Sequence, residues 1–157
     1  MGKLIMENEE QKGLNKFIDC LIAAIHEGGL SNNDSAIKAG ELIAGLRGKG
    51  NPNSMVPGGG MPALEYLPKA IKNAGSGPIV IRDLVTCFEK IVDRLPWYRR
   101  SEPALPDFMR GHANAFIIGP NGLEKRGKLV VGTSLLAPKV EYPPHNHLPN
   151  ELYVAMS

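Results

Sequence analysis

The sequence predicts an α+β fold, in which a helical region over residues 1–95 precedes a β-rich region over residues 96–157. Before Pro96, apolar residues recur at the three- and four-residue spacing of amphipathic helices. After Pro96, the apolar runs are short and are separated by Gly or Pro, which is typical of strands and turns. At 157 residues, the chain is long enough to bury a core as one domain or as a helical unit joined to a β unit.

Four helical segments are expected in the first region. They cover residues 11–27, residues 31–48, part of 61–73 and residues 81–95. The first and the last have the clearest apolar faces, so we expect these two helices to pack together. Those faces consist of Leu14, Phe17, Ile18, Leu21, Ile22 and Ile25 in the first, and of Ile81, Leu84, Val85, Phe88, Ile91, Val92 and Leu95 in the last.

Short strands are expected in the second region at residues 113–118, 128–137 and 142–147, and a further strand begins near Glu151. The turn-forming sequence Leu-Pro-Asn at residues 148–150 separates the last two. Several short strands at this spacing are typical of an all-β barrel or sandwich.

Four chemically active side chains lie within nine positions of one another in the predicted strand-turn-strand segment: His145, His147, Glu151 and Tyr153. Histidines at i and i+2 of an extended segment project from the same face and can bind one ion. The turn would bring Glu151 back toward them, with Tyr153 on the same face. Two close histidines in a polar loop are commonly only solvated, but the added carboxylate and phenol favour an open catalytic metal site.

Composition and charge limit the classes of partner. Lys and Arg number 18 against 16 Asp and Glu, so the net charge of +2 predicts no nucleic-acid partner. The densest basic cluster, Lys125, Arg126 and Lys128, is flanked by glycines and is expected to be a solvated hairpin tip. No apolar run approaches the length of a membrane span, and the first residues do not form a signal peptide. We therefore expect a cytoplasmic protein without a membrane partner.

Cys20 and Cys87 are the two cysteines of the chain, and each lies in a helical apolar pattern. This usage predicts reduced, buried thiols, with a disulfide between them as the alternative.

Three runs in the second region resemble the cupin-type dimethylsulfoniopropionate (DMSP) lyases: LPWYRR, FIIGPNG, and GKLVVGTSLLAPKVEYPPHNHLPNELYVAMS. The resemblance covers roughly Leu95–Ser157, while the helical part is similar only in kind. The ligand positions of the first cupin motif, G(X)5HXH(X)3,4E(X)6G, are met by His145, His147 and Glu151. The form YPxHxHxxxExY of the family is met as well, and it adds Tyr142, Pro143 and Tyr153.

This resemblance implies a helical N-terminal region followed by a partial cupin β-barrel. It also implies a divalent metal ion, such as Zn, Fe, Mn or Ni, on His145, His147 and Glu151, with Tyr153 as the base. The implied substrate is the small molecule DMSP, which lyase action converts into acrylate and dimethyl sulfide. A sulfonium cation favours an aromatic face. The candidates for this contact are Tyr142, Trp97 and Tyr98, and packing in the core is an equal alternative for the last two.

The sequence departs from the cupin pattern at two positions. Lys139 occupies the position of the opening glycine, and the closing glycine would follow Ser157. The second cupin motif is absent as well. We therefore expect a chain truncated after the first motif, with an incomplete site, which a second copy could complete as a homodimer.

Two other functions remain open from the sequence. The same three ligands serve other metal-binding cupins, such as dioxygenases and isomerases, although Tyr153 favours the lyase. A non-catalytic, ligand-binding cupin fragment is the third interpretation, and the missing second motif supports it.

Overall fold

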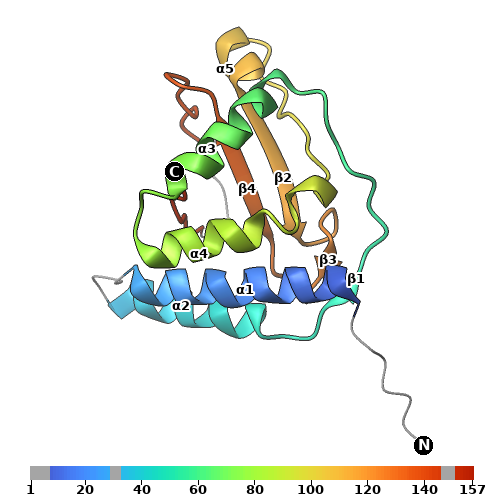
Figure 1. Cartoon of the computed structure of the whole chain (residues 1–157), viewed down its shortest axis with the longest axis vertical. Coiled ribbons are helices and arrows are strands. Elements are labelled where there is room, and N and C mark those ends of the chain that lie inside the picture. Colours follow the sequence, from blue (N-terminus) through green and yellow to red (C-terminus); the bar gives the residue numbers. More distant parts are fainter. Residues whose placement is uncertain (1–7, 29–32, 146–150) are drawn as a thin grey trace, which may run out of the picture.

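The structure is a computed structural model that describes residues 8–28, 33–145 and 151–157. Its helices are α1 (Glu9–Glu27), α2 (Asn33–Leu46), α3 (Leu67–Ala74), α4 (Ile79–Phe88) and α5 (Pro106–Gly111), with 3₁₀ turns η1 (Pro62–Tyr66) and η2 (Val92–Arg94). Its strands are β1 (Asn51–Pro52), β2 (His112–Ile118), β3 (Glu124–Lys125) and β4 (Val131–Leu136). Helices come first and a small mixed sheet follows, so the α+β prediction is confirmed (Figure 1). The division into regions 1–95 and 96–157 stays a prediction.

Helix α1 forms where its apolar periodicity predicts it. The Asn8 side chain caps its start, because Oδ1 accepts a hydrogen bond of 2.8 Å from the backbone N–H of Gln11. The helix ends at Gly28, whose N–H donates to the carbonyl of Ala24. Its buried face packs against α4, where the rings of Phe17 and Phe88 lie 6.2 Å apart. The predicted pairing of these two helices is confirmed.

The fourth predicted helix was expected to reach residue 95, and this boundary is wrong. Helix α4 ends at Phe88, after which Lys90 and Ile91 donate their N–H groups to the carbonyls three residues earlier. Such bonds tighten the last turn into a 3₁₀ geometry. Ile91 and Leu95 are still completely buried in this tighter turn. The predicted apolar positions are therefore buried, although the α-helix ends before them.

The sheet has the strand order β1-β3-β2-β4. Strands β2 and β4 are antiparallel, with His112 opposite Leu136, and they confirm the strands predicted at 113–118 and 128–137. Strand β3 runs parallel to β2, and β1 pairs with β3 in the antiparallel direction. These strands form an open sheet in the part of the chain that the structure describes, which is compatible with part of a barrel but does not close one.

The strand-turn-strand expected around the two histidines is wrong as far as it can be followed. Residues 138–145 and 151–157 contain no strand, while the turn at 148–150 lies outside the described residues. Pro143 and Pro144 have no N–H to donate, which disfavours pairing of this segment with a neighbouring strand. The side chains of Leu152, Val154 and Met156 pack against the hydrophobic core instead.

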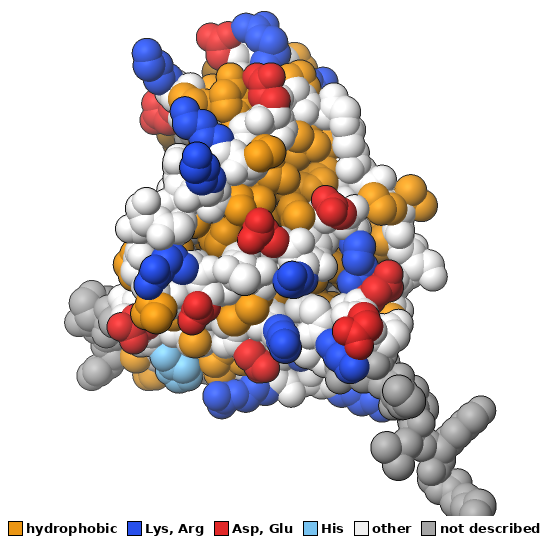
Figure 2. All heavy atoms as spheres, viewed as in Figure 1, with side chains coloured by type: hydrophobic (Ala, Val, Ile, Leu, Met, Phe, Trp, Pro, Cys, Tyr) orange, Lys and Arg blue, Asp and Glu red, His pale blue; other side chains and the backbone are white. Residues whose placement is uncertain are grey.

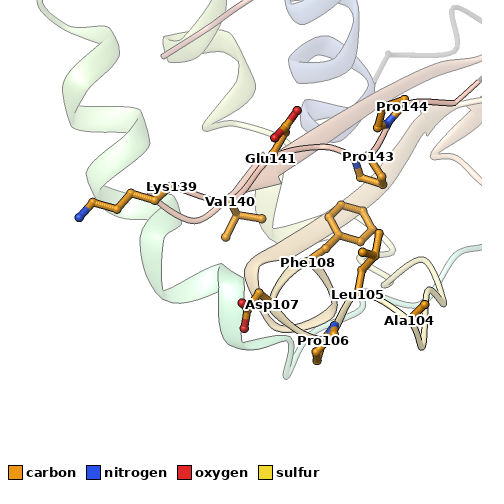
Figure 3. A pocket seen from close by; sticks show the side chains of 10 residues that line it. All are labelled: Ala104, Leu105, Pro106, Asp107, Phe108, Lys139, Val140, Glu141, Pro143 and Pro144. Carbon is orange, nitrogen blue, oxygen red and sulfur yellow. The ribbon is translucent and has the colours of Figure 1, made fainter.

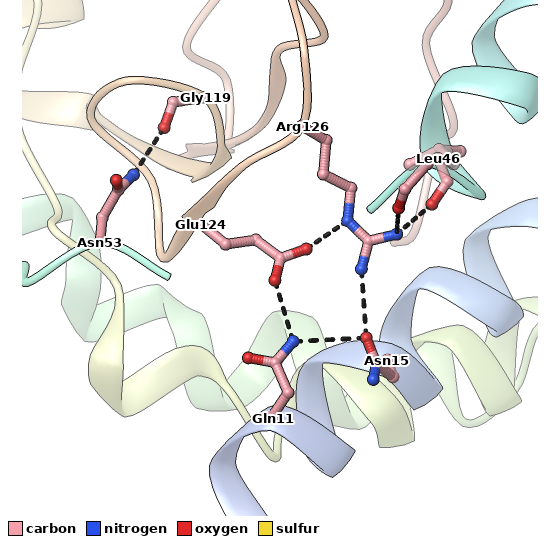
Figure 4. Close-up of polar contacts among 8 residues, drawn as sticks. Gln11, Asn15, Leu46, Asn53, Gly119, Glu124 and Arg126 are labelled. Carbon is pink, nitrogen blue, oxygen red and sulfur yellow. Dashed lines mark hydrogen bonds and ion pairs between the residues drawn. The ribbon is translucent and has the colours of Figure 1, made fainter. Parts of the chain in front are cut away.

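A buried ion pair joins the sheet to the helices. Glu124 is fully buried and forms an ion pair with Arg126, which is 9% exposed (Figure 4). The expectation of a solvated hairpin tip is therefore wrong for Arg126, which is buried. Lys125 and Lys128 are exposed, as expected. This correction follows from the same-face spacing of residues 124 and 126 on an extended chain.

Both members of the ion pair have further partners on two helices. Gln11 of α1 donates to the Glu124 carboxylate over 2.9 Å, and Arg126 donates to the side-chain oxygen of Asn15 over 3.1 Å. Arg126 also donates to the carbonyl oxygens of Leu46 and Gly48, where α2 ends. The guanidinium thereby satisfies carbonyl groups that the end of a helix leaves without partners.

Charge is distributed evenly over the face seen in Figure 2, where Lys, Arg, Asp and Glu side chains are interspersed. Hydrophobic side chains gather in the upper half of this face, in front of the sheet and above α4 (Figures 1 and 2). None of the helices in the described parts of the chain is long and apolar enough to span a bilayer.

The ion pair provides a stability prediction. Glu124→Gln leaves the buried guanidinium of Arg126 without its counter-charge, and we expect the free energy of unfolding to fall by about 3 kcal/mol. Urea unfolding followed by circular dichroism measures the change. Lys12→Gln, which removes the exposed ion pair with Glu9, is the control and should leave the midpoint unchanged. Equal midpoints for Glu124→Gln and wild type would show that the pair does not hold the two layers together.

Candidate metal and proton-transfer site

Three of the four predicted site residues meet in space. The Nε2 atom of His145 lies 3.6 Å from a carboxylate oxygen of Glu151 and 3.3 Å from the hydroxyl of Tyr153. The Tyr153 hydroxyl donates a hydrogen bond to the same Glu151 oxygen. The fourth residue, His147, lies outside the described residues. Within the described ranges, no group of three or more His, Cys, Asp or Glu side chains could hold a metal ion.

The spacing of these donor atoms fits a shared ion. Nitrogen and oxygen ligands bind Zn²⁺ at about 2.0–2.2 Å, so two ligands at octahedral or tetrahedral angles lie roughly 2.8–3.6 Å apart. The separation of 3.6 Å between His145 Nε2 and Glu151 Oε2 is at the upper end of that range. An imidazole and a carboxylate, with a second imidazole two residues from the first, form a donor set that suits Zn, Fe, Mn or Ni.

Tyr153 is the proton-transfer candidate, and its surroundings hold its proton firmly. The hydrogen bond to the Glu151 carboxylate, followed by burial, raises the pKa of Tyr153 to about 12. The negative charge of Glu151 acts in the same direction. The side chain is nevertheless 73% exposed, so a small substrate can reach the hydroxyl.

Tyr142 connects the candidate site to the sheet. Its ring makes edge contacts with His145, at a centroid distance of 5.2 Å, and with Phe108, at 5.3 Å. A hydrogen bond between its hydroxyl and the guanidinium of Arg100 is the largest cause of the raised pKa of Arg100. Tyr142 therefore lies next to the metal-ligand candidate His145, and its role in substrate binding stays a prediction.

The other two aromatic candidates lie further along the sheet. Tyr98 is half-exposed and stacks on Phe116 of β2 at 5.3 Å, and its backbone forms an antiparallel bridge with Asn114. Burial raises the pKa of the Tyr98 hydroxyl. Trp97 is 8% exposed and belongs to the hydrophobic core, so the structure gives it a packing position.

His112 is a residue near the site that the sequence did not single out. It is fully buried, and its ring stacks on Phe108 at a centroid distance of 3.7 Å. Its Nδ1 lies 2.6 Å from the carbonyl oxygen of Phe108, while its Nε2 accepts a hydrogen bond of 3.0 Å from the N–H of Arg100. These two contacts fix the neutral tautomer that carries its proton on Nδ1. His112 thus holds Phe108 in place, and Phe108 in turn contacts Tyr142. No spacing pattern in the sequence distinguished this histidine.

A cleft of about 380 Å³ lies between α5 and the segment that leads to His145 (Figure 3). Phe108 and Val140 face each other across it, and Pro143 and Pro144 form its side nearest to His145. At its rim is Lys139, which has a φ of 65° in the left-handed region. This is the position of the opening glycine in the cupin motif, so the backbone adopts the conformation that favours glycine although a lysine is present.

A comparison with known families identifies the family of the chain. A family model described as dimethylsulfoniopropionate lyase matches residues 35–157, from the first turns of α2 through the segment that contains Tyr153. The chain belongs to the dimethylsulfoniopropionate lyase family. The predicted resemblance to DMSP lyases is confirmed, and the match extends it from the β region into the helices. No curated protein and no solved structure matches the chain.

The contact between Glu151 and Tyr153 can be tested on metal-free protein of this DMSP lyase family member. Glu151→Gln removes the carboxylate whose hydrogen bond, together with its charge, raises the pKa of Tyr153, so we expect that pKa to fall from about 12 toward its ordinary value near 10. A titration followed by NMR of ¹³Cζ-labelled tyrosine resolves Tyr153 from the other three tyrosines. Glu141→Gln is the control and should leave the pKa of Tyr153 in place. An unchanged pKa in Glu151→Gln would contradict the geometry described above.

Proposed function

We propose that the protein is a metal-dependent DMSP lyase, which converts dimethylsulfoniopropionate into acrylate and dimethyl sulfide by β-elimination. The observation that carries this proposal is the convergence of His145, Glu151 and Tyr153 in a member of the DMSP lyase family. Two ligand types and a phenol within hydrogen-bonding distance are what a metal-assisted proton abstraction requires.

In the proposed reaction, Tyr153 first loses its phenolic proton to the solvent, and the oxygen of the resulting phenolate accepts the proton from the α-carbon of the substrate. The electron pair of the broken C–H bond forms the double bond of acrylate. As this double bond forms, the C–S bond breaks with its electron pair remaining on sulfur, so dimethyl sulfide leaves as a neutral molecule. The exposure of Tyr153 leaves its hydroxyl accessible to the α-carbon of such a substrate.

His145, His147 and Glu151 would hold the divalent ion, which when bound supplies Lewis-acid stabilisation of the negative charge that develops at the substrate carboxylate. The proposed roles of Glu151 and Tyr153 require the hydrogen bond between them to break. While the Glu151 oxygen accepts the phenolic hydrogen bond, it raises the pKa of Tyr153 and opposes a role as base. Glu151 can relieve that effect only by directing the oxygen to another partner, as it would in the role of a ligand.

Tyr142 would contact the sulfonium end of the substrate. Its ring lies against His145 and is supported from behind by Phe108. A cation over an aromatic ring gains about 0.5–2 kcal/mol. Tyr98 is the second aromatic candidate, although its ring stacks on Phe116 of β2.

The base role of Tyr153 predicts a specific loss. Tyr153→Phe should lower the rate of dimethyl sulfide release at least about 100-fold, because the proton acceptor is lost. Metal content should stay at the wild-type level, since the ligands remain. Tyr66→Phe removes the same hydroxyl group from η1 and serves as the matched control. Equal activity in Tyr153→Phe and wild type would exclude Tyr153 as the base.

The role of Tyr142 predicts a change in substrate binding. Tyr142→Leu should raise the KM for DMSP by about 2- to 30-fold, because the aromatic face is lost. Tyr142→Phe retains that face and should keep a KM near that of wild type. Steady-state kinetics with gas-chromatographic detection of dimethyl sulfide measures both. If the two variants raised KM equally, the hydroxyl and its contact with Arg100 would be responsible instead.

A further inference from the structure

The two cysteines of the chain, 67 positions apart in sequence, meet between α1 and α4. The Sγ atoms of Cys20 and Cys87 lie 2.8 Å apart, and both side chains are half-buried. A disulfide bond is about 2.05 Å long, so the two sulfur atoms need to approach by less than about 1 Å to form one. The helices that carry them form a closely packed pair, in which the rings of Phe17 and Phe88 are also in contact.

We propose that Cys20 and Cys87 form a site of reversible oxidation, at which a hydroperoxide generates a disulfide that joins α1 to α4. One thiolate attacks the terminal oxygen of the hydroperoxide, the O–O bond breaks, the alkoxide (hydroxide from hydrogen peroxide) leaves, and the attacking sulfur becomes a sulfenic acid. The sulfur of the second cysteine then attacks the sulfenic sulfur. The S–S bond forms, and the sulfenic hydroxyl leaves with a proton as water. Two thiols are oxidised, and one hydroperoxide is reduced.

The surroundings of Cys20 slow its reaction with a hydroperoxide. Burial, followed by the contact with Cys87, raises the pKa of the Cys20 thiol to about 12. The negative charges of Asp83 and Asp19 act in the same direction. Because the thiolate is the reactive form, a thiol with a raised pKa reacts slowly at neutral pH.

A disulfide between Cys20 and Cys87 would join the two helices against which residues 152–155 lie. A cavity of about 420 Å³ lies between α1 and α4, and residues 152–155 form its remaining side. Its lining includes Ile25 from α1, Ile81 from α4, and Tyr153. A covalent bond between the helices would fix the separation of the two walls against which this segment packs. The formation of the disulfide itself does not depend on the proposed lyase activity.

The test uses the full chain, purified in reductant and then exposed to hydrogen peroxide. We expect the intact monomer to lose about 2 Da, the mass of two hydrogen atoms, and to become unreactive toward N-ethylmaleimide. Dithiothreitol should reverse both changes. Because the chain contains only two cysteines, a loss of 2 Da in the monomer identifies the bond.

Cys20→Ser and Cys87→Ser are the matched controls, and each should gain oxygen without losing 2 Da. Circular dichroism verifies that both variants are folded, and Cys→Ala variants replace either one that is not. Closing a loop of this length should also raise the Tm of the wild-type monomer by roughly 10 °C on oxidation. Separate oxidation of both thiols in the monomer, or a disulfide that forms only between two chains, would overturn the proposal.

Discussion

The buried ion pair between Glu124 and Arg126 is the contact on which the two layers of the molecule depend. Glu124 belongs to β3, and Arg126 follows it. Side chains of α1 and the carbonyls of Leu46 and Gly48, at the end of α2, form hydrogen bonds with the pair, which thus connects three elements that are distant in sequence. The fit is close, because a Cβ atom on Gly50 would collide with the Glu124 carboxylate. Two charges removed from water are tolerated only when their other hydrogen-bonding positions are occupied as well, and the helices supply those partners.

Beyond the ion pair, a row of ring contacts connects β2 to the candidate site. His112 holds Phe108, Phe108 contacts Tyr142, and Tyr142 contacts His145. The rings of His112 and Phe108 are buried, and the half-buried ring of Tyr142 joins them to His145, so β2 and α5 support the position of His145 rather than a strand of its own. This explains how a segment with two consecutive prolines, without a strand in its described residues, can still present an imidazole beside Glu151 and Tyr153.

The sequence predicted the parts of this structure that depend on local pattern. The periodicity of residues 11–27 predicted α1 and its pairing with α4, and the spacing of His145, Glu151 and Tyr153 predicted a cluster that does form. It could not predict features that depend on distant contacts. Helix α4 stops at Phe88 because a tight turn also buries Ile91, and Arg126 is buried because two helices supply partners for it. The sequence could not predict the position of His112 either, because only the fold brings it together with Phe108 and Arg100.

The central claim is that His145 and His147 hold a divalent ion that the lyase reaction needs. Elemental analysis of the purified chain, beside the double variant His145→Ala/His147→Ala, tests it most directly when dimethyl sulfide release from DMSP is assayed on the same samples. We predict about one metal ion per wild-type chain together with sulfide release, and neither in the double variant. Equal metal content in both proteins, or sulfide release that survives the loss of both histidines, would contradict the account. Metal without sulfide release in the wild type would identify a metal-binding protein that is not a lyase.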